Sequence, residues 1–314
     1  MPTRIAAAFH GVCLAGSLLL TSAMAPVLFS AEPSWVKTTW RGDAGWTAVQ
    51  GSVRAVVIEI RSRLIYLGSL DGTFNLLNAP YPQALPTEEN PSPNQGGHRF
   101  WLGPQSRWKW PPLTEWEYAP AASVAASGSV LTVVQARIDP GYPAVVREYA
   151  WEGNRMRCTA RWKDDGQPHF GLHVVPVDAP LTLAVRLVRT AEVPAGAVAA
   201  QMVNPEPALQ LPDPSVAVNG DVATVSSGIK TLKAGFAPQA LTIVRPRGWK
   251  LSVQPGAYEG IAITAPDHGY LSQVWVGTVK EQLAELEQLS PFLKGDASGF
   301  CAATIYIEAT PPSP

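Results

Sequence analysis

The sequence predicts an all-β protein in which many antiparallel strands form a sandwich or a barrel. Charged residues make up only 16% of the 314 residues, and the chain contains 30 prolines, which favour turns over long helices. Short runs rich in valine and threonine recur along the chain. Turn residues separate these runs at intervals that are typical of sandwiches and barrels.

Each predicted strand is a short apolar or alternating run with turn residues on both sides. Near the start, for example, Val56, Ile58 and Ile60 alternate with Val57, Glu59 and Arg61, which predicts two different strand faces. The predicted strands are Thr47–Ile60, Leu64–Gly68, Phe74–Leu77, Val130–Ile138, Val145–Trp151, Arg155–Trp162, Phe170–Val177, Leu181–Val188, Val222–Ser226, Thr231–Ala234, Leu241–Arg245, Lys250–Val253, Ile261–Thr264, Leu271–Val276 and Ala303–Glu308.

Short turn sequences indicate which of these strands pair. Asp-Gly at 71–72 is a strong hairpin signal, and EGN at 152–154 predicts a hairpin between the strands that flank it. The sequence DAP at 178–180 predicts a further pair. Residues 79–97 and 101–128 are rich in Pro, Ser, Asn and Ala, so we expect irregular loops there. Loops of that length in a β domain usually serve a site or are disordered.

One segment near the end of the chain has a helical pattern. In VKEQLAELEQL, Val279, Leu283, Leu286 and Leu289 follow one another at spacings of 4, 3 and 3 residues. The residues between them are good helix formers. Taken alone, residues 279–289 therefore predict a helix.

The first 31 residues have the order of a secretory signal peptide. Arg4 supplies a positive charge, the apolar run Ile5–Leu20 follows, and small residues precede Glu32. The apolar run is shorter than the roughly 20 residues that a membrane span needs. We therefore expect a leader at 1–31, one secreted or periplasmic domain at 32–314, and an uncleaved anchor as the alternative.

The composition of the mature chain excludes several classes of protein. Loss of Arg4 leaves 23 basic against 25 acidic residues, a formal charge of −2, which gives no electrostatic reason to bind nucleic acid or acidic membranes. No later run of 18 uncharged apolar residues predicts a membrane span. Free buried thiols are the expected state of Cys158 and Cys301, and a disulfide between them is the alternative.

The segment QGGHRFWLGPQSRWKWPP, residues 95–112, concentrates aromatic and polar groups. Trp101, Trp108 and Trp110 offer flat apolar faces, on which sugars stack. Arg99 and Gln105 have planar donors that suit sugar hydroxyls, and Gly-Gly at 96–97 permits a turn where a side chain would clash. The segment therefore indicates a carbohydrate site. The alternative is that the tryptophans close one end of the core.

Three motifs resemble the DUF4380 family of bacterial proteins of unknown function. They are IEIRSRLIYLGSLDGTFNLLN, the following GGHRFWLGPQSRWKWPP, and the late LAELEQLSP, and they span most of the mature chain. The chain departs from the family at RSR, residues 61–63, where a glycine usually precedes the arginine. That family is similar to galactose mutarotase and aldose 1-epimerase proteins, which bind sugars in a groove.

The resemblance implies a more specific fold than the composition does. It implies a large antiparallel β-supersandwich with a groove that faces a carbohydrate. It also implies that LAELEQLSP is a strand, with Glu285 and Glu287 on one face. This contradicts the helical spacing, and we follow the resemblance because tertiary context often overrides propensity in short segments.

Mutarotation requires one group that removes the anomeric proton and another that protonates the ring oxygen. The resemblance places His173 on the strand that carries the acid and Glu285 or Glu287 in the position of the base. His98, in the loop, is expected to contact the ligand. A structural role for each residue is the alternative, with the glutamates solvated or paired with arginine.

Other chemistry finds little support. The sequence has no Gly-x-Ser-x-Gly, no His-Glu-x-x-His and no cysteine pair at zinc spacing, so we expect no metal and no cofactor. The preferred interpretation is a secreted carbohydrate-binding protein of mutarotase-like fold. The first alternative is an aldose 1-epimerase-like enzyme, and the second is a non-catalytic β-sandwich interaction module.

Overall fold

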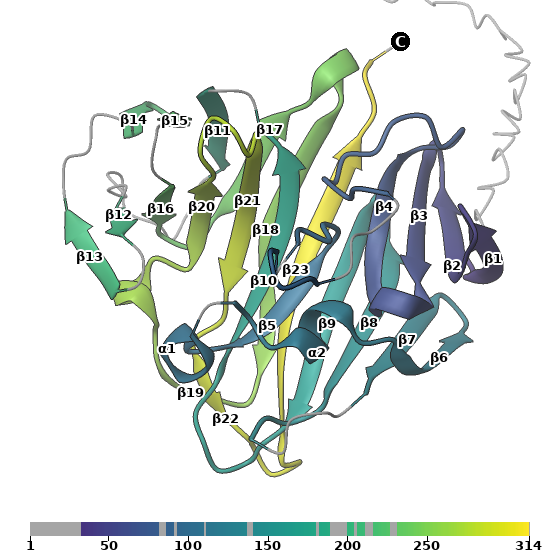
Figure 1. Cartoon of the computed structure of the whole chain (residues 1–314), viewed down its shortest axis with the longest axis horizontal. Coiled ribbons are helices and arrows are strands. Elements are labelled where there is room, and N and C mark those ends of the chain that lie inside the picture. Colours follow the sequence, from purple (N-terminus) through teal and green to yellow (C-terminus); the bar gives the residue numbers. More distant parts are fainter. Residues whose placement is uncertain are drawn as a thin grey trace, which may run out of the picture. The chain divides into compact units, whose positions relative to one another are not determined.

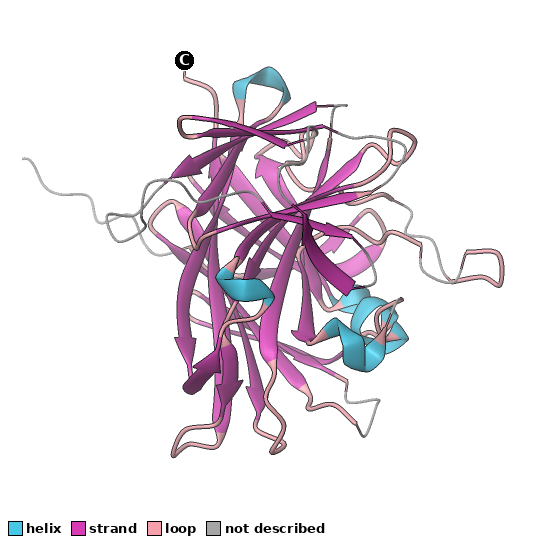
Figure 2. Cartoon of the chain, turned by 90° about the vertical axis from the view of Figure 1, so that its left-hand side faces the viewer, coloured by secondary structure: helices cyan, strands magenta, loops and turns pink. Residues whose placement is uncertain are grey.

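The computed structural model describes residues 33–81, 86–90, 93–109, 111–136, 141–179, 182–188, 200–203, 206–210, 216–226 and 231–313. They belong to one unit, Glu32–Pro314. The predicted leader, Trp110 and the ends of two predicted strands at Ile138 and Leu181 lie outside the described residues. Strands predominate, as Figure 2 shows, so the predicted all-β antiparallel fold is confirmed.

The first sheet has four strands in chain order. The strands are β1 (Val36–Trp40), β2 (Asp43–Gln50), β3 (Val53–Ile58) and β4 (Arg63–Ser69), and all neighbours are antiparallel. Only two residues, Arg41 and Gly42, join β1 to β2, because Trp40 pairs directly with Asp43.

A seven-stranded antiparallel sheet contains most of the residues predicted to form a site. Its order is β13 (Glu206–Gln210), β12 (Ala200–Val203), β16 (Leu232–Phe236), β20 (Ser272–Val276), β21 (Leu283–Leu289), β10 (Phe170–Asp178) and β5 (Arg99–Gly103). Figure 1 shows β21, β10 and β5 beside one another, as their register requires.

The third sheet has ten antiparallel strands. Their order is β14 (Val216–Asn219), β15 (Val222–Ser226), β11 (Thr182–Val188), β17 (Ala240–Val244), β18 (Lys250–Glu259), β23 (Phe300–Thr310), β9 (Arg155–Lys163), β8 (Val145–Glu152), β7 (Val130–Gln135) and β6 (Ala121–Ser127). The predicted hairpin at EGN is confirmed, since Glu152 pairs with Arg155. In β7, buried residues alternate with half-buried ones, which is the pattern of a strand with one face on the core.

The remaining elements are short. β19 (Ile261–Thr264) pairs with β22 (Phe292–Lys294). Two α-helical turns, α1 (Gln105–Trp108) and α2 (Thr114–Tyr118), contact β5 (Figure 1). Three 3-10 turns occupy Glu59–Arg61, Pro246–Gly248 and Asp267–Gly269.

The main core lies between the seven-stranded and ten-stranded sheets. Val175, Val274 and Leu286 of the first sheet belong to one buried cluster with Leu251 and Ile305 of the second. We call the side of the seven-stranded sheet that faces this core its inner face, and the opposite side its outer face. Burial of such apolar side chains away from water is the main contribution to the stability of the fold.

The structure corrects three local predictions. Residues 283–289 form strand β21. The helix predicted from the leucine spacing is therefore wrong, and the strand implied by the resemblance is confirmed. The strands on either side of DAP do not pair, because β10 and β11 belong to different sheets. Residues 101–128 are not wholly irregular, since they include the end of β5, two helical turns and β6.

Two smaller predictions have mixed outcomes. Phe74–Leu77 is not a strand and makes a single bridge, from Asn75 to Gly68. Cys158 and Cys301 are free and buried, as expected.

Candidate functional site

The strand register decides which predicted residues share a face of the seven-stranded sheet. Directly paired residues in an antiparallel sheet project to the same side, and successive residues alternate. His173 pairs with Gln288 on one side and Phe100 on the other, whereas Val174 pairs with Glu287 and Arg99. His173 is therefore on the inner face, and Arg99 and Glu287 are on the outer face.

The inner face holds a buried pair of histidines. His98 Nε2 and His173 Nδ1 are 2.9 Å apart, and the two rings are stacked. The other nitrogens reach Tyr149 Oη at 3.4 Å and the backbone oxygen of Ala303 at 3.1 Å. Each histidine is 1% exposed. Both imidazoles thus satisfy their hydrogen bonds inside the core rather than at an accessible site.

Burial also changes the protonation of this pair. Desolvation lowers the pKa of His173 to about 3, and it lowers the pKa of His98 well below its usual value, with further effects from His173 and Arg147. Both imidazoles are therefore neutral near pH 7. A neutral imidazole beneath the sheet does not supply the acid that was predicted for a sugar ring.

The predicted acid and bases are not brought together. His173 projects toward the ten-stranded sheet, whereas Glu285 and Glu287 project from the outer face of β21. The sheet itself separates them. The predicted pairing of His173 with either glutamate is thus not supported, although the two glutamates share one face as the resemblance implied.

The outer face carries a row of three chemically different groups. Lys233 on β16 pairs with Trp275 on β20, which in turn pairs with Glu285 on β21. Such directly opposed side chains have Cβ atoms about 5 Å apart. Trp275 is half-buried, in contrast to its neighbours Val274 and Val276, which are fully buried.

Two ion pairs cross this face diagonally. Arg99 Nη1 lies 3.1 Å from Glu285 Oε1, and Lys233 Nζ lies 2.6 Å from Glu287 Oε2. The side chain of Lys233 is 19% exposed and that of Glu285 is 11% exposed, whereas that of Glu287 is only 2% exposed. We call Arg99, Lys233, Trp275, Glu285 and Glu287 the outer-face cluster.

Within this cluster, the carboxyl group of Glu285 has a strongly shifted pKa. Burial raises the pKa of its carboxyl to about 7, against the opposing effect of Arg99 and with a contribution from Glu287. Burial would lower the pKa of Lys233, but Glu287, together with Asp267 and Glu285, outweighs that effect and raises it. A carboxyl that titrates near neutral pH can donate or accept a proton there, which is a common property of functional sites.

A second carboxylate, that of Glu117, has Oε2 3.9 Å from Arg99 Nε. Glu117 on α2 accepts hydrogen bonds from Arg63 Nη1 at 3.1 Å and from Trp101 Nε1 at 2.6 Å. Burial would raise the pKa of Glu117, but the Arg63 and Arg99 guanidiniums outweigh that effect and hold it below its usual value. Arg99 also donates to Asn94 Oδ1 at 2.6 Å. Its orientation toward Glu285 is thus fixed by several contacts.

The tryptophans of the aromatic segment are core residues where the structure describes them. Trp101 and Trp108 are 4% and 9% exposed, and their rings pack edge to face at 5.9 Å. Trp108 packs in the same way on Trp116, at 5.8 Å. The core alternative is therefore the correct interpretation of Trp101 and Trp108, and neither presents an open face to a sugar. Gln105 begins α1 and is partly exposed.

The double glycine sets the entry of the chain into β5. Gly96 and Gly97 have φ of 59° and 67°, a region that L-residues disfavour. A Cβ on Gly97 would lie 2.5 Å from the backbone oxygen of Leu64. The prediction that a side chain would clash here is confirmed. The turn then directs His98 inward and Arg99 outward.

Sequence reasoning missed Trp275 and Lys233. Both lie in predicted strands, and the run Leu271–Val276 already carries an indole at an alternating position. Nothing local, however, places Trp275 between Lys233 and Glu285, because β16, which carries Lys233, is far in sequence from the neighbouring strands β20 and β21. Within the described residues, no group of three metal-binding side chains is present and no helix is long and apolar enough to cross a membrane.

Comparison with solved structures identifies the fold. A galactose mutarotase-like protein from Lactobacillus casei ATCC 334 matches with a TM-score of 0.57 at 11% identity, over 85% of this chain and 100% of the other. A putative aldose 1-epimerase from Escherichia coli K12 matches with a TM-score of 0.54 at 13% identity, over 84% and 98%. A putative mutarotase from Salmonella typhimurium gives 0.52 at 8%, over 88% and 94%.

No protein-family model and no curated protein matches the chain. The resemblance to the DUF4380 family thus stays a prediction. At such low identities the structural matches establish the architecture alone. The chain has the antiparallel β-sandwich fold of galactose mutarotase-like proteins.

Proposed function

We propose that this protein binds a neutral saccharide on the outer face of the seven-stranded sheet. The row Lys233–Trp275–Glu285 is the observation that carries the proposal. The half-buried Trp275 would pack on the C–H face of a sugar ring, while the ammonium and carboxyl groups on either side would offer hydrogen bonds to its hydroxyls. Arg99 holds Glu285 in place.

The charges of the outer-face cluster favour a neutral ligand. Its two cations each face a carboxyl group, at 3.1 Å for Arg99 and Glu285 and at 2.6 Å for Lys233 and Glu287. A charged ligand would have to displace one of these partners, and removal of a partner from a buried pair is costly. Sugar hydroxyls donate and accept hydrogen bonds without disturbing the charge balance.

Calorimetric titration with a panel of neutral mono- and oligosaccharides tests the proposal. Trp275→Ala should weaken binding by about 2 kcal/mol, roughly thirtyfold in Kd, because it removes the aromatic surface. Glu285→Gln keeps the shape of the side chain and should weaken binding less. The control is Glu259→Gln, which changes a carboxylate that pairs with Arg161 on the ten-stranded sheet.

Two results would overturn the proposal. One is that no saccharide of the panel binds the wild-type protein. The other is that Trp275→Ala binds as tightly as wild type while its thermal unfolding is unchanged. Either result favours the alternative of a non-catalytic β-sandwich interaction module.

A second candidate function rests on the pKa of Glu285. A carboxyl with a pKa of about 7 suits proton transfer to or from an anomeric hydroxyl, which is the chemistry of an aldose 1-epimerase. The candidate requires that Glu285 act without His173, since the sheet lies between them. Polarimetry of freshly dissolved α-galactose and α-glucose tests it. Glu285→Gln should abolish any acceleration of mutarotation, and an equal rate with and without wild-type protein excludes the activity.

The leader is a separate part of the proposal. A signal peptide at 1–31 would deliver the domain of residues 32–314 to the periplasm or the exterior, where saccharides are encountered. The order of basic, apolar and small residues supports this. Mass spectrometry of the protein from the bacterial periplasm and medium tests it, because an intact Met1–Leu20 segment in the isolated protein contradicts cleavage.

A further inference from the structure

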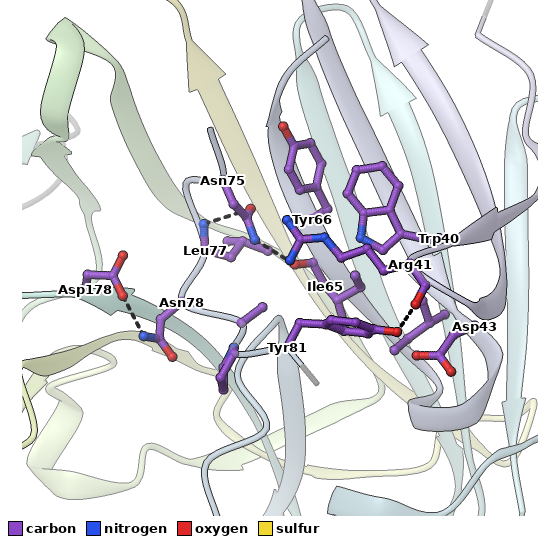
Figure 3. Close-up of a pocket in the computed structure, with 13 residues that line it drawn as sticks. Trp40, Arg41, Asp43, Ile65, Tyr66, Asn75, Leu77, Asn78, Tyr81 and Asp178 are labelled. Atoms are coloured by element: carbon purple, nitrogen blue, oxygen red, sulfur yellow. Dashed lines mark hydrogen bonds between the residues drawn. The ribbon is translucent and has the colours of Figure 1, made fainter. Parts of the chain in front are cut away.

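A pocket of about 230 Å³ lies away from the outer-face cluster, on the side of the four-stranded sheet. Its walls come from the β1–β2 turn, from β4, from the segment after Leu77 and from the end of β10 (Figure 3). Pockets for drug-sized ligands are usually about 300–1,000 Å³. The volume is therefore suited to one small ring with its substituents.

The cationic residue in the lining of this pocket is Arg41, which occupies an unusual place in the chain. Arg41 and Gly42 form the two-residue turn between β1 and β2, and both have positive φ, 51° and 100°. Turns of this kind favour asparagine or glycine at both positions, and an ordinary L-residue there costs about 1 kcal/mol. The geometry of the turn thus gives no reason for an arginine.

Aromatic rings hold the guanidinium in the pocket. Its central carbon lies 5.8 Å from the Trp40 ring centroid and 5.6 Å from that of Tyr81. The Tyr81 hydroxyl donates to the backbone oxygen of Arg41, which fixes the turn against the opposite wall. Figure 3 shows the guanidinium between the rings of Tyr66 and Tyr81.

No described residue accepts a hydrogen bond from this guanidinium. In the described part of the chain, the side chain of Arg41 makes no hydrogen bond and no ion pair. This distinguishes Arg41 from Arg99, which pairs with Glu285. A guanidinium offers a planar fork of N–H donors that matches a carboxylate with two parallel hydrogen bonds.

The acidic groups of the pocket do not compete strongly for Arg41. The Asp178 carboxylate already accepts from Asn78 Nδ2 at 2.6 Å and from Arg245 Nη2 at 3.0 Å. In Figure 3, the Asp43 carboxylate is drawn on the other side of the Tyr81 ring from the guanidinium, and no ion pair joins Asp43 to Arg41. These oxygens are acceptors that suit the hydroxyl groups of a ligand.

We propose that this pocket is a second binding site, and that it takes a sugar acid such as a hexuronate. The carboxylate would bind the Arg41 fork, the ring would pack against Trp40 and Tyr81, and hydroxyls would reach Asp43 and Asn78. The sugar component rests on the proposed function, whereas the preference for an anion rests on Arg41 alone.

A chain of polar contacts connects the pocket to the outer-face cluster. Asn78 Oδ1 accepts from Asn94 Nδ2 at 2.8 Å, and Asn94 Oδ1 accepts from Arg99 Nη2 at 2.6 Å. Arg99 then contacts Glu285. The two sites are therefore parts of one polar network, which is a reason to expect related ligands in both.

The test compares acidic and neutral sugars that share a ring. Galacturonate and glucuronate are titrated against the full mature protein by calorimetry, beside galactose and glucose. Arg41→Gln should weaken uronate binding about tenfold to a hundredfold, because a charge-assisted pair is lost, and should leave the neutral sugars unaffected. The matched control is Arg247→Gln, since Arg247 also has positive φ, 62°, and stacks on an aromatic ring, Phe74, outside the pocket.

The outcomes separate this inference from the proposed function. The proposal for the pocket is overturned if wild type and Arg41→Gln bind uronate equally well. It is also overturned if Arg247→Gln loses as much uronate affinity as Arg41→Gln. Uronate binding that is lost in Trp275→Ala but kept in Arg41→Gln also overturns it and supports the outer face alone. If neutral sugars fail to bind while uronate binding still requires Arg41, the pocket stands and the proposed function fails. No uronate binding by wild type rejects the inference.

Discussion

His173 and Glu287 lie on neighbouring strands, one position apart in register, and project from opposite faces of the same sheet. The imidazole bonds to the backbone oxygen of Ala303 in the core, and the carboxylate bonds to Lys233 on the outer face. A short distance between backbones therefore does not create a catalytic pair. The inner face packs on the core of the sandwich, and the outer face carries the two ion pairs of the outer-face cluster.

The first prediction concerns the pH dependence of stability that His173 causes. Its pKa falls from 6.5 to about 3 on folding, so between these values the unfolded state binds more protons. Stability is then fully present above pH 6.5 and is lost as the pH falls toward 3, by up to roughly 4–5 kcal/mol. His173→Gln should flatten this slope in urea unfolding curves recorded between pH 7 and pH 3.5.

The control for this prediction is His268→Gln. His268 is exposed in the turn Asp267–Gly269, so its replacement should leave the wild-type slope intact. An unchanged slope in His173→Gln would show that His173 is not the cause.

The second prediction concerns Glu285 and has the opposite sign. Its pKa rises from 4.5 to about 7 on folding, so the folded state binds more protons in that interval. The contribution is present below pH 4.5 and is lost as the pH rises through 7, by about 3 kcal/mol at most. Relative to wild type, Glu285→Gln should therefore gain stability from pH 4.5 to pH 8.

Denaturant unfolding of both proteins at several pH values measures this difference. Glu259→Gln, at a 52% exposed carboxylate, should show a difference from wild type that hardly changes with pH. A constant difference for Glu285→Gln would mean that this carboxyl has an ordinary pKa in the folded protein.

Many strands were predictable because each one has its own local sequence pattern. Alternation and turn residues located most strands of the ten-stranded sheet, including the hairpin of β8 and β9. The partners of a strand are less predictable, since pairing depends on long-range packing. The sequence DAP at 178–180 therefore predicted a hairpin, whereas β10 and β11 diverge into different sheets.

The segment LAELEQL shows why local periodicity misled. Its leucines have helical spacing, but apolar and acidic residues also alternate along it. Ala284 and Leu286 point inward, whereas Glu285 and Glu287 point outward. Two buried glutamates on a strand are stable only because Arg99 and Lys233 arrive from distant strands. No window of sequence contains those partners.

The aromatic segment was ambiguous for a related reason. A sugar platform and a core plug require the same side chains, and only burial distinguishes them. Trp101 packs against Trp108, which packs against Trp116, whereas the half-buried Trp275 lies in an ordinary strand. Which of the predicted residues share a face thus depends on the strand register, and their roles at a site stay predictions.

The third prediction concerns the ion pair of Lys233 and Glu287. Lys233→Met leaves a carboxylate that is 2% exposed without its cation, which should cost about 3–5 kcal/mol of unfolding free energy. Adding Glu287→Gln should recover much of that loss, because the buried charge is removed. Arg161→Met, at the exposed pair with Glu259, should cost less than about 1 kcal/mol. No recovery in the double variant would contradict the pairing.

The fourth prediction concerns the double glycine before β5. Gly97→Ala places a Cβ 2.5 Å from the Leu64 backbone oxygen at a φ of 67°, so it should cost more than about 2 kcal/mol. Gly51→Ala, at a φ of 57° with open space around it, should cost only about 1 kcal/mol, which is the penalty of the backbone conformation. Thermal unfolding of both variants measures the contrast. Because Gly97 directs Arg99 to the outer face, Gly97→Ala should also weaken saccharide binding, and equal melting temperatures would show that β5 can shift to relieve the contact.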